Sequence, residues 1–187
     1  MHVANLDRGI EPPSEASINF SRDEIEGTIL ERFAKIARLF PDRIAVATAA
    51  QQLTYRELDG EAERVAAFIL AQRDYVIEPV ALLFENGIPL LAAILAVVET
   101  GKFFLLIDPT DPPARRAAVL ADVQAGLALT DRPEISRSGE EQSPCRVVQY
   151  AEVPGLPVAT PLTRAMSSTD LAVIVYTSGS TGEPKGV

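Results

Sequence analysis

The sequence holds one cysteine, Cys145, one histidine, His2, and no tryptophan in its 187 residues. One thiol cannot close an internal disulfide or build a zinc site from several thiolates, and this favours a reducing compartment. His2 lies near the N-terminus, where chains fray, so we expect no Ser-His-Asp arrangement, Cys-His pair or HExxH zinc site with a placed imidazole within this chain. These scarcities argue against several classes of enzyme.

Basic side chains and long apolar runs are also scarce. The chain has 17 lysines and arginines against 26 aspartates and glutamates, a formal charge of -9 and a pI near 4.7. Such a surface repels the phosphates of nucleic acids and of anionic lipid. The apolar run 89–98 is shorter than the ~20 residues of a membrane helix, and residues 1–17 lack the apolar core of a signal peptide. We therefore expect a cytoplasmic protein with no nucleic-acid or membrane partner.

What the chain does contain is typical of a globular domain. Hydrophobic residues make up 47% and charged residues 23%, which excludes a mainly disordered protein. We predict a flexible N-terminal segment over residues 1–20 and one partial domain over residues 21–187.

Two capping boxes predict the first helices. Ser21-x-x-Glu24 begins a helix that ends before Pro41, with an apolar stripe expected to cover other apolar residues. Thr54-x-x-Glu57 begins a second helix, whose inward-facing residues recur every three or four positions, as on one face of a helix. The two predicted stripes are Ile25, Ile29, Phe33, Ile36 and Phe40, and Leu58, Ala62, Val65, Ala66, Ile69 and Leu70.

Two further helices follow from other signals. Residues 89–99 are apolar nearly all round, with Gly101 at a position suited to a left-handed cap. We expect Asp111 to cap the last helix, Pro112 to occupy its first position and Gly126 to end it.

Short apolar runs between the helices predict strands. Several of them, such as 80–84 (VALLF) and 103–107 (FFLLI), are apolar at every position, as in strands buried on both faces. Strands of this kind alternating with helices indicate an α/β fold with a mostly parallel sheet flanked by helices. Ligands of such sheets bind beyond the carboxyl ends of the strands. The remaining strands are expected at 44–48, 127–130, 146–150 and 171–176, with a polar loop over 131–144.

The most informative segment is 176–186, where six consecutive small hydroxyl or glycine residues precede Glu183, Pro184 and Lys185. Glycines allow the main chain to approach an anion, amides and hydroxyls donate hydrogen bonds, and a lysine adds a compact positive charge. This chemistry suits a polyphosphate. The segment is no Walker A loop, because two residues separate Gly182 from Lys185. A flexible Gly/Ser/Thr linker is the alternative.

Three motifs, in order, resemble those of the adenylate-forming enzymes, and most closely the amino-acid adenylation domains of nonribosomal peptide synthetases, which belong to the same superfamily as acyl-CoA synthetases. The segments are 53–58 (LTYREL), 95–109 (LAVVETGKFFLLIDP) and 176–187 (YTSGSTGEPKGV). The family often has alanine at Thr100 and proline at Leu106. The resemblance implies an incomplete, N-terminal portion of the adenylate-forming fold.

The resemblance also implies a function: a carboxylate, here an amino acid, attacks ATP, pyrophosphate leaves, and the acyl adenylate passes to a thiol. It implies ATP and Mg²⁺ as cofactors, and a phosphopantetheinyl carrier domain or coenzyme A as the thiol partner. It assigns no acid-base catalytic residue and no metal ligand to this chain. The residues expected to hold the β- and γ-phosphates are Thr177, Ser178, Gly179, Ser180, Thr181, Gly182 and Lys185.

Members of this family are more than twice as long, and their acyl pocket, acidic ribose- and magnesium-linked residues and mobile lysine domain lie beyond the matching part. We therefore expect the 187 residues to be inactive alone. One alternative is a truncated, non-catalytic remnant that binds nucleotide weakly and exposes an apolar edge. Another is an α/β interaction domain with a flexible Gly/Ser tail.

The other polar residues have structural interpretations. Asp108 and Asp111 are expected at a turn and a helix cap, not as a metal pair. Cys145 is expected to be an inert thiol, and Tyr55 and Tyr150 are expected to be packing residues.

Overall fold

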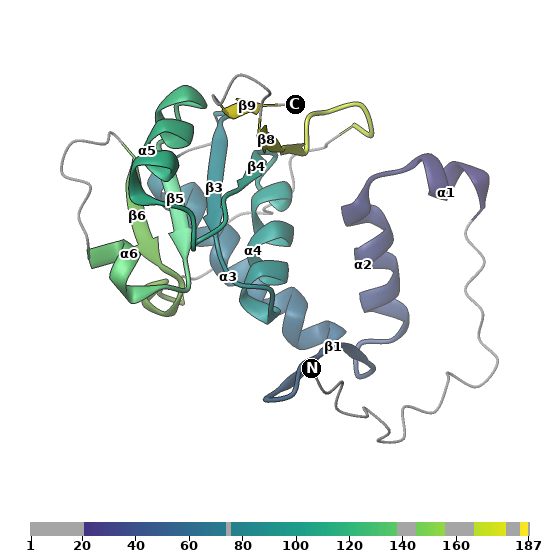
Figure 1. Cartoon of the computed structure of the whole chain (residues 1–187). Coiled ribbons are helices and arrows are strands. Elements are labelled where there is room, and N and C mark those ends of the chain that lie inside the picture. Colours follow the sequence, from purple (N-terminus) through teal and green to yellow (C-terminus); the bar gives the residue numbers. More distant parts are fainter. Residues whose placement is uncertain (1–20, 74–75, 138–144, 156–166, 179–183, 187) are drawn as a thin grey trace, which may run out of the picture.

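A computed structural model describes residues 21–73, 76–137, 145–155, 167–178 and 184–186. The predicted flexible segment 1–20 lies outside these residues. Figure 1 shows helices on both sides of a central sheet, with α1 (Arg22–Glu26) and α2 (Ile29–Leu39) set to one side of it. No helix among the described residues is long and apolar enough to cross a membrane.

The central sheet has five parallel strands in the order β6-β5-β3-β4-β7, which confirms the predicted α/β class. Ala81 of β3 lies opposite Leu105 of β4 on one side and Ala128 of β5 on the other. All five residues of β3 are buried, as the continuous apolar run predicts. The strands are β3 (Pro79–Leu83), β4 (Phe103–Leu106), β5 (Leu127–Thr130), β6 (Arg146–Gln149) and β7 (Val173–Ile174).

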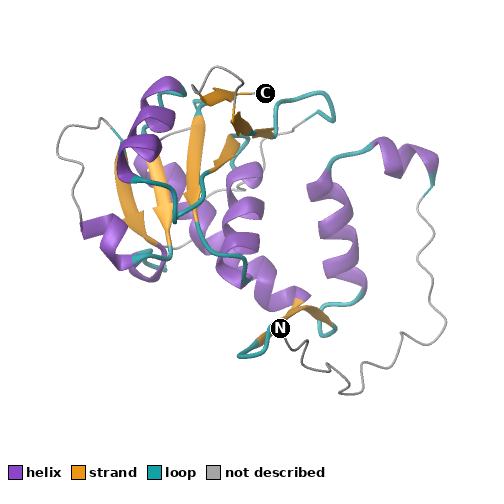
Figure 2. Ribbon diagram, viewed as in Figure 1, coloured by secondary structure: helices purple, strands orange, loops and turns teal. Residues whose placement is uncertain are grey.

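Two hydrophobic cores lie on the two faces of this sheet. Helices α3 (Tyr55–Arg73) and α4 (Ile88–Glu99) cover one face, and α5 (Pro113–Asp122) and α6 (Pro133–Arg137) cover the other (Figure 2). Successive strand residues point to opposite faces, so Leu82 belongs to the α3–α4 core and Leu83 to the α5 core. This layering leaves the ends of the strands as the accessible parts of the sheet.

The helix α3 begins at the predicted capping box. The Thr54 hydroxyl accepts a hydrogen bond from the Glu57 amide at 3.2 Å, and the Glu57 carboxylate accepts from the Thr54 amide at 2.8 Å. At the end of α4, Gly101 has a φ of 73°, in the left-handed region that glycine adopts without strain. Both sequence predictions are confirmed.

The first predicted helix is in fact two helices, because a second capping box interrupts it. Gly27 is extended, and the Thr28 side chain accepts a hydrogen bond from the Glu31 amide at 3.2 Å to begin α2. Ile25 and Ile29 are 56% and 67% exposed, so the stripe does not cover a core along its whole length.

The boundaries predicted for α5 are also wrong. Its N-cap is Pro112, and Asp111 instead forms an ion pair with Arg115 at 3.4 Å. The helix ends at Asp122 and not at Gly126 as predicted, and Gln124, with a φ of 55°, makes a left-handed turn just after it.

Several shorter predictions need correction. The predicted polar loop contains α6, and the strand predicted at 146–150 ends at Gln149, before the 3-10 helix η1 (Tyr150–Glu152). Leu106 of β4 is 42% exposed, so this strand is not buried on both faces. An antiparallel hairpin of β1 (Ile44–Ala47) and β2 (Gln52–Thr54) precedes α3.

Candidate functional site

The glycine- and hydroxyl-rich segment is bracketed by a hairpin. The single strand predicted at 171–176 is split into β7 and β8 (Tyr176–Ser178), and β8 pairs antiparallel with β9 (Pro184–Gly186). In this register the backbone of Thr177 lies opposite Lys185, and Ser178 lies opposite Pro184. The hairpin therefore brings Ser178 and Pro184 together, one on each side of the segment 179–183. Gly179, Ser180, Thr181 and Gly182 themselves lie outside the described residues.

Tyr176 fixes the base of this hairpin to the core. Its hydroxyl donates a hydrogen bond to Asp122 Oδ2 at 2.5 Å, at the C-terminal end of α5, and its ring packs against the α5 core. Burial and the neighbouring carboxylate raise the pKa of Tyr176 to about 12, so the hydroxyl stays protonated and keeps donating. A Cβ at Gly186 would lie 3.2 Å from Ile174 Cγ2, so glycine allows β9 to lie close to β7.

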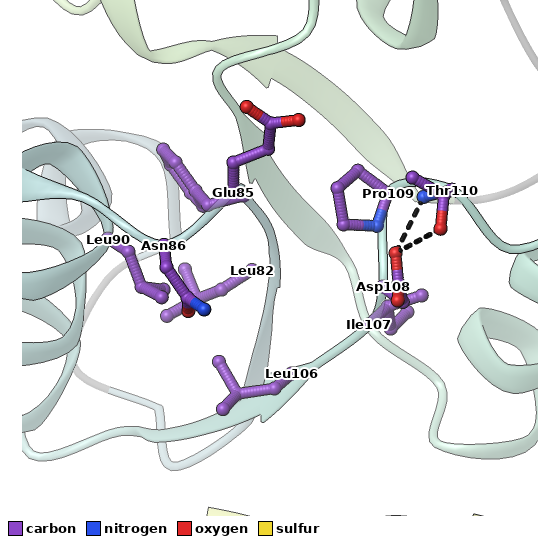
Figure 3. Close-up of a pocket in the computed structure, with 10 residues that line it drawn as sticks. Leu82, Glu85, Asn86, Leu90, Leu106, Ile107, Asp108, Pro109 and Thr110 are labelled. Carbon is purple, nitrogen blue, oxygen red and sulfur yellow. Dashed lines mark hydrogen bonds between the residues drawn. The ribbon is translucent and has the colours of Figure 1, made fainter. Parts of the chain in front are cut away.

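A second candidate site is a pocket of about 540 Å³ at the carboxyl ends of β3 and β4. The chain leaves β3 through α4 on one face of the sheet and leaves β4 through α5 on the other, and such divergence opens a crevice between neighbouring parallel strands. Figure 3 shows the side chains around it. The lining residues are Leu82, Phe84, Glu85, Asn86, Leu90, Leu106, Ile107, Asp108, Pro109 and Thr110.

The rim of this pocket is acidic. Asp108 accepts hydrogen bonds from the Thr110 hydroxyl at 2.6 Å and the Thr110 amide at 2.8 Å, which hold the pKa of Asp108 below its ordinary value. Glu85 is paired with Arg132, and its amide donates to Asp131 Oδ2 at 3.3 Å. An ionised Asp108 beside an apolar floor disfavours phosphate and favours an apolar group with a positively charged neighbour.

The structure does not join the two candidate sites. Every lining residue of the pocket comes from β3, β4, the segments that follow them, or α4, and none comes from β8 or β9. Sequence reasoning located the hairpin segment but missed Glu85 and Asn86. A signal was available, because both residues directly follow a buried strand, at the edge where ligands of parallel sheets bind.

The described residues offer no cluster of three or more histidines, cysteines, aspartates and glutamates that could hold a metal ion. Asp108 forms the predicted turn, and Cys145 is buried just before β6. Tyr150 packs edge-on against Phe84 with ring centroids 5.7 Å apart, as predicted, and also donates a hydrogen bond to Glu61 at 2.8 Å.

Comparison with known proteins finds one matching family model and relatives among large synthases. The family model described as AMP-binding enzyme matches residues 33–187. An enniatin synthase of Fusarium equiseti is 37% identical over 150 residues, which are 79% of this chain and 5% of that protein. The chain therefore spans only a small part of the curated relatives it matches.

Two solved structures share the fold. The N-terminal subdomain of NpsA from Klebsiella oxytoca, in complex with 3-hydroxybenzoyl-AMSN, is 25% identical with a TM-score of 0.73, over 86% of this chain and 40% of that one. The nonribosomal peptide synthetase FmoA3, in its α-methyl-L-serine-AMP bound form, is 30% identical with a TM-score of 0.75, over 86% of this chain and 18% of that one.

Proposed function

This chain belongs to the AMP-binding enzyme family, and on that premise we propose that it takes part in the ATP-dependent activation of an amino acid as its acyl adenylate. The proposed reaction joins a carboxylate oxygen to the α-phosphorus of ATP and breaks the bond to pyrophosphate, which leaves. The adenylate then passes to a thiol, for which we propose a phosphopantetheinyl carrier domain. We propose that a longer protein carries out the complete reaction, and that these 187 residues alone do not catalyse it.

The observation that carries this proposal is the β8–β9 hairpin at the signature segment. A flexible linker has no need of paired flanking strands, whereas here β8 and β9 pair antiparallel on the two sides of the segment 179–183. We propose that the amides and hydroxyls of Thr177, Ser178, Gly179, Ser180, Thr181 and Gly182, together with the ammonium of Lys185, bind the β- and γ-phosphates.

This set of donors suits a polyphosphate chemically. Amide and hydroxyl groups donate to phosphate oxygens, and a lysine balances part of the charge that accumulates on the departing pyrophosphate. These residues bind and orient the phosphates and move no proton. Mg²⁺ would neutralise further phosphate charge when bound.

The substrate proposal is supported by the relatives. The FmoA3 structure holds α-methyl-L-serine-AMP and the NpsA structure holds 3-hydroxybenzoyl-AMSN, so relatives with this fold bind both an aminoacyl adenylate and an analogue of an aryl acid adenylate. We propose an amino acid here because the LTYREL and IDP segments resemble the amino-acid-activating branch.

The test is amino-acid-dependent exchange of pyrophosphate with ATP, measured in the full-length gene product. We expect the double variant Ser180→Ala with Lys185→Ala to lose at least about tenfold in exchange rate, because donors that stabilise charge in the transition state are lost. Lys35→Ala is the matched control, since Lys35 of α2 pairs with Glu24 of α1. We expect this variant to exchange pyrophosphate at the normal rate. Normal exchange by the double variant would contradict the assignment of the loop.

A further inference from the structure

The β8–β9 hairpin is attached to the central sheet by very little backbone. β8 and β9 pair with each other and form a sheet of their own, separate from the five-stranded sheet. Only Val175 separates β8 from β7, a strand of two residues that pairs with β4 at the edge of the described sheet. Backbone pairing among the described residues therefore does not set the direction of the hairpin, and side-chain contacts have to set it.

Tyr176, the first residue of β8, makes such a contact. It lies opposite Gly186 of β9, and a Cβ at Gly186 would lie 3.3 Å from Tyr176 Cζ. Its hydroxyl donates to Asp122 Oδ2 at 2.5 Å, and its ring packs against the α5 core. In Figure 1 the hairpin lies beside one end of α5. Tyr176 therefore links both strands of the hairpin to α5.

The helix α5 is well held in place as a support for this contact. Val119 and Leu120, in its second half, are buried in the core on that face of the sheet. Arg116, in its first half, is also buried, and its guanidinium donates to two backbone carbonyls of the loop that precedes the helix. The position of Asp122 is thus fixed by packing along the whole helix.

Asp122 occupies a position that is unfavourable for the helix itself. It is the last residue of α5, and the last turn contains no basic side chain. The C-terminal end of a helix carries a partial negative charge, so a carboxylate there is repelled, whereas a lysine or arginine would stabilise the helix. Residues that break a local rule of this kind are expected at positions that serve function. Here the carboxylate serves as the acceptor for Tyr176.

We propose that Asp122 is a positioning residue for the phosphate-binding segment and acts through the hydroxyl of Tyr176. The backbone pair of Thr177 and Lys185 directly follows the pair of Tyr176 and Gly186, one residue or about 3.3 Å further along the hairpin. Fixing Tyr176 therefore fixes the point from which both sides of the segment start. The inference rests on the proposed function, in which this segment binds the β- and γ-phosphates.

The kinetics of pyrophosphate exchange in the full-length gene product test the effect on the reaction. Asp122→Ala removes the acceptor, and Tyr176→Phe removes the donor but keeps the ring. We expect each variant to lower kcat about tenfold and to change the KM for the amino acid less than about twofold, because displaced donors weaken the transition state more than the bound substrate. Asp122→Asn keeps an oxygen acceptor and should retain most of the rate. The double variant Asp122→Ala with Tyr176→Phe should be no slower than the slower single variant, because all three lose the same hydrogen bond.

Asp111→Ala is the matched control for these variants. Asp111 lies just before the other end of α5, where it pairs with Arg115 at 3.4 Å. We expect the Asp111→Ala variant to exchange pyrophosphate at the normal rate. A normal kcat in Asp122→Ala, or equal kcat values in Asp122→Asn and Asp122→Ala, would overturn the proposal.

Amide hydrogen–deuterium exchange tests the anchor independently of activity. Peptides that cover residues 176–186 should take up deuterium faster in Asp122→Ala and in Tyr176→Phe than in the original protein, while Asp122→Asn and Asp111→Ala should match the original. Unchanged deuterium uptake in Asp122→Ala would contradict the anchor, whatever the kinetics. An original protein that takes up deuterium as expected but exchanges no pyrophosphate would instead contradict the proposed function.

Discussion

The guanidinium of Arg73 occupies the space in which residue 126 would carry a side chain. A Cβ built on Gly126 would lie 2.1 Å from Arg73 Nη2 and 2.5 Å from its Cζ. Arg73 cannot move away freely, because its Nε and Nη2 donate to the Glu78 carboxylate at 3.0 and 2.6 Å. Gly126 is therefore needed for the approach of another side chain, and not for a helix end as the sequence suggested.

Gly126→Ala should destabilise the protein by about 1–2 kcal/mol, because the Arg73–Glu78 pair must shift. Urea denaturation measures this. Gly60→Ala is the matched control, since Gly60 lies within α3 and a Cβ there meets nothing within 4 Å. We expect the control to gain about 0.5–1 kcal/mol from helix propensity. Equal stabilities of the two alanine variants would refute this account of Gly126.

The second prediction concerns Lys102, whose side chain is fully buried. Its ammonium donates to Val76 O at 2.5 Å, to Arg73 O at 3.3 Å and to Glu78 Oε1 at 3.2 Å. Lys102→Met keeps most of the volume but leaves the two carbonyls without this donor, and we expect a loss of about 2–3 kcal/mol in the free energy of unfolding.

The double variant Lys102→Met with Glu78→Gln gives the control for charge. It removes both members of the buried pair, so it should lose less than the sum of the two single variants. If the loss in free energy of unfolding of the double variant, measured by urea denaturation, equals the sum of the two single losses, Lys102 and Glu78 do not interact.

Stability should also depend on pH through Glu99. Burial, and then repulsion by Asp59 and Glu63, raise the pKa of Glu99 to about 7. Its Oε2 is buried and has no hydrogen-bond partner among the residues that the structure describes. A raised folded-state pKa means that the folded protein binds the proton more tightly than the unfolded chain. The free energy of unfolding contributed by this group therefore falls as pH rises from about 4.5 to 7.

Glu99→Gln should remove this loss. We expect the variant to be more stable than the original protein at pH 8 and to show a flatter profile between pH 5 and pH 8, measured by urea denaturation at each pH. Glu63→Gln removes only the repulsion and should have a smaller effect of the same sign. If the free energy of unfolding depends on pH in the same way in Glu99→Gln and in the original protein, Glu99 is not the cause of the pH dependence.

The capping box of α3 gives a fourth prediction. Thr54→Ala removes the oxygen that accepts from the Glu57 amide at 3.2 Å, and we expect a loss of about 1 kcal/mol in thermal or urea unfolding. Thr54→Ser keeps this acceptor and should lose much less. A serine variant as unstable as the alanine variant would point to lost methyl packing and not to capping.

Much of the fold was predictable because the signals are local. The Thr54-x-x-Glu57 box, the left-handed Gly101 and the apolar runs of β3 and β5 each depend on a few neighbouring residues, and each was predicted near its observed place. The first helix was predicted wrongly because its apolar spacing continues through Gly27, although Thr28 and Glu31 form a second capping box.

The candidate site was predictable in part. The signature segment stands out by composition, but its pairing as β8 and β9 depends on residues on both sides of the turn. The pocket was missed because Glu85 and Asp108 are 23 positions apart, and only the pairing of β3 with β4 brings the ends of the two strands together.

The sequence by itself determined the local elements, the α/β class and the resemblance of three segments to one family, since these depend on short-range spacing and residue chemistry. Only the tertiary structure decided that β5 lies beside β3, that Arg73 fills the space over Gly126 and that Leu106 is exposed. The reason is physical: strand order and side-chain burial depend on which distant segments pack together, and packing is non-directional, so no local pattern encodes it uniquely.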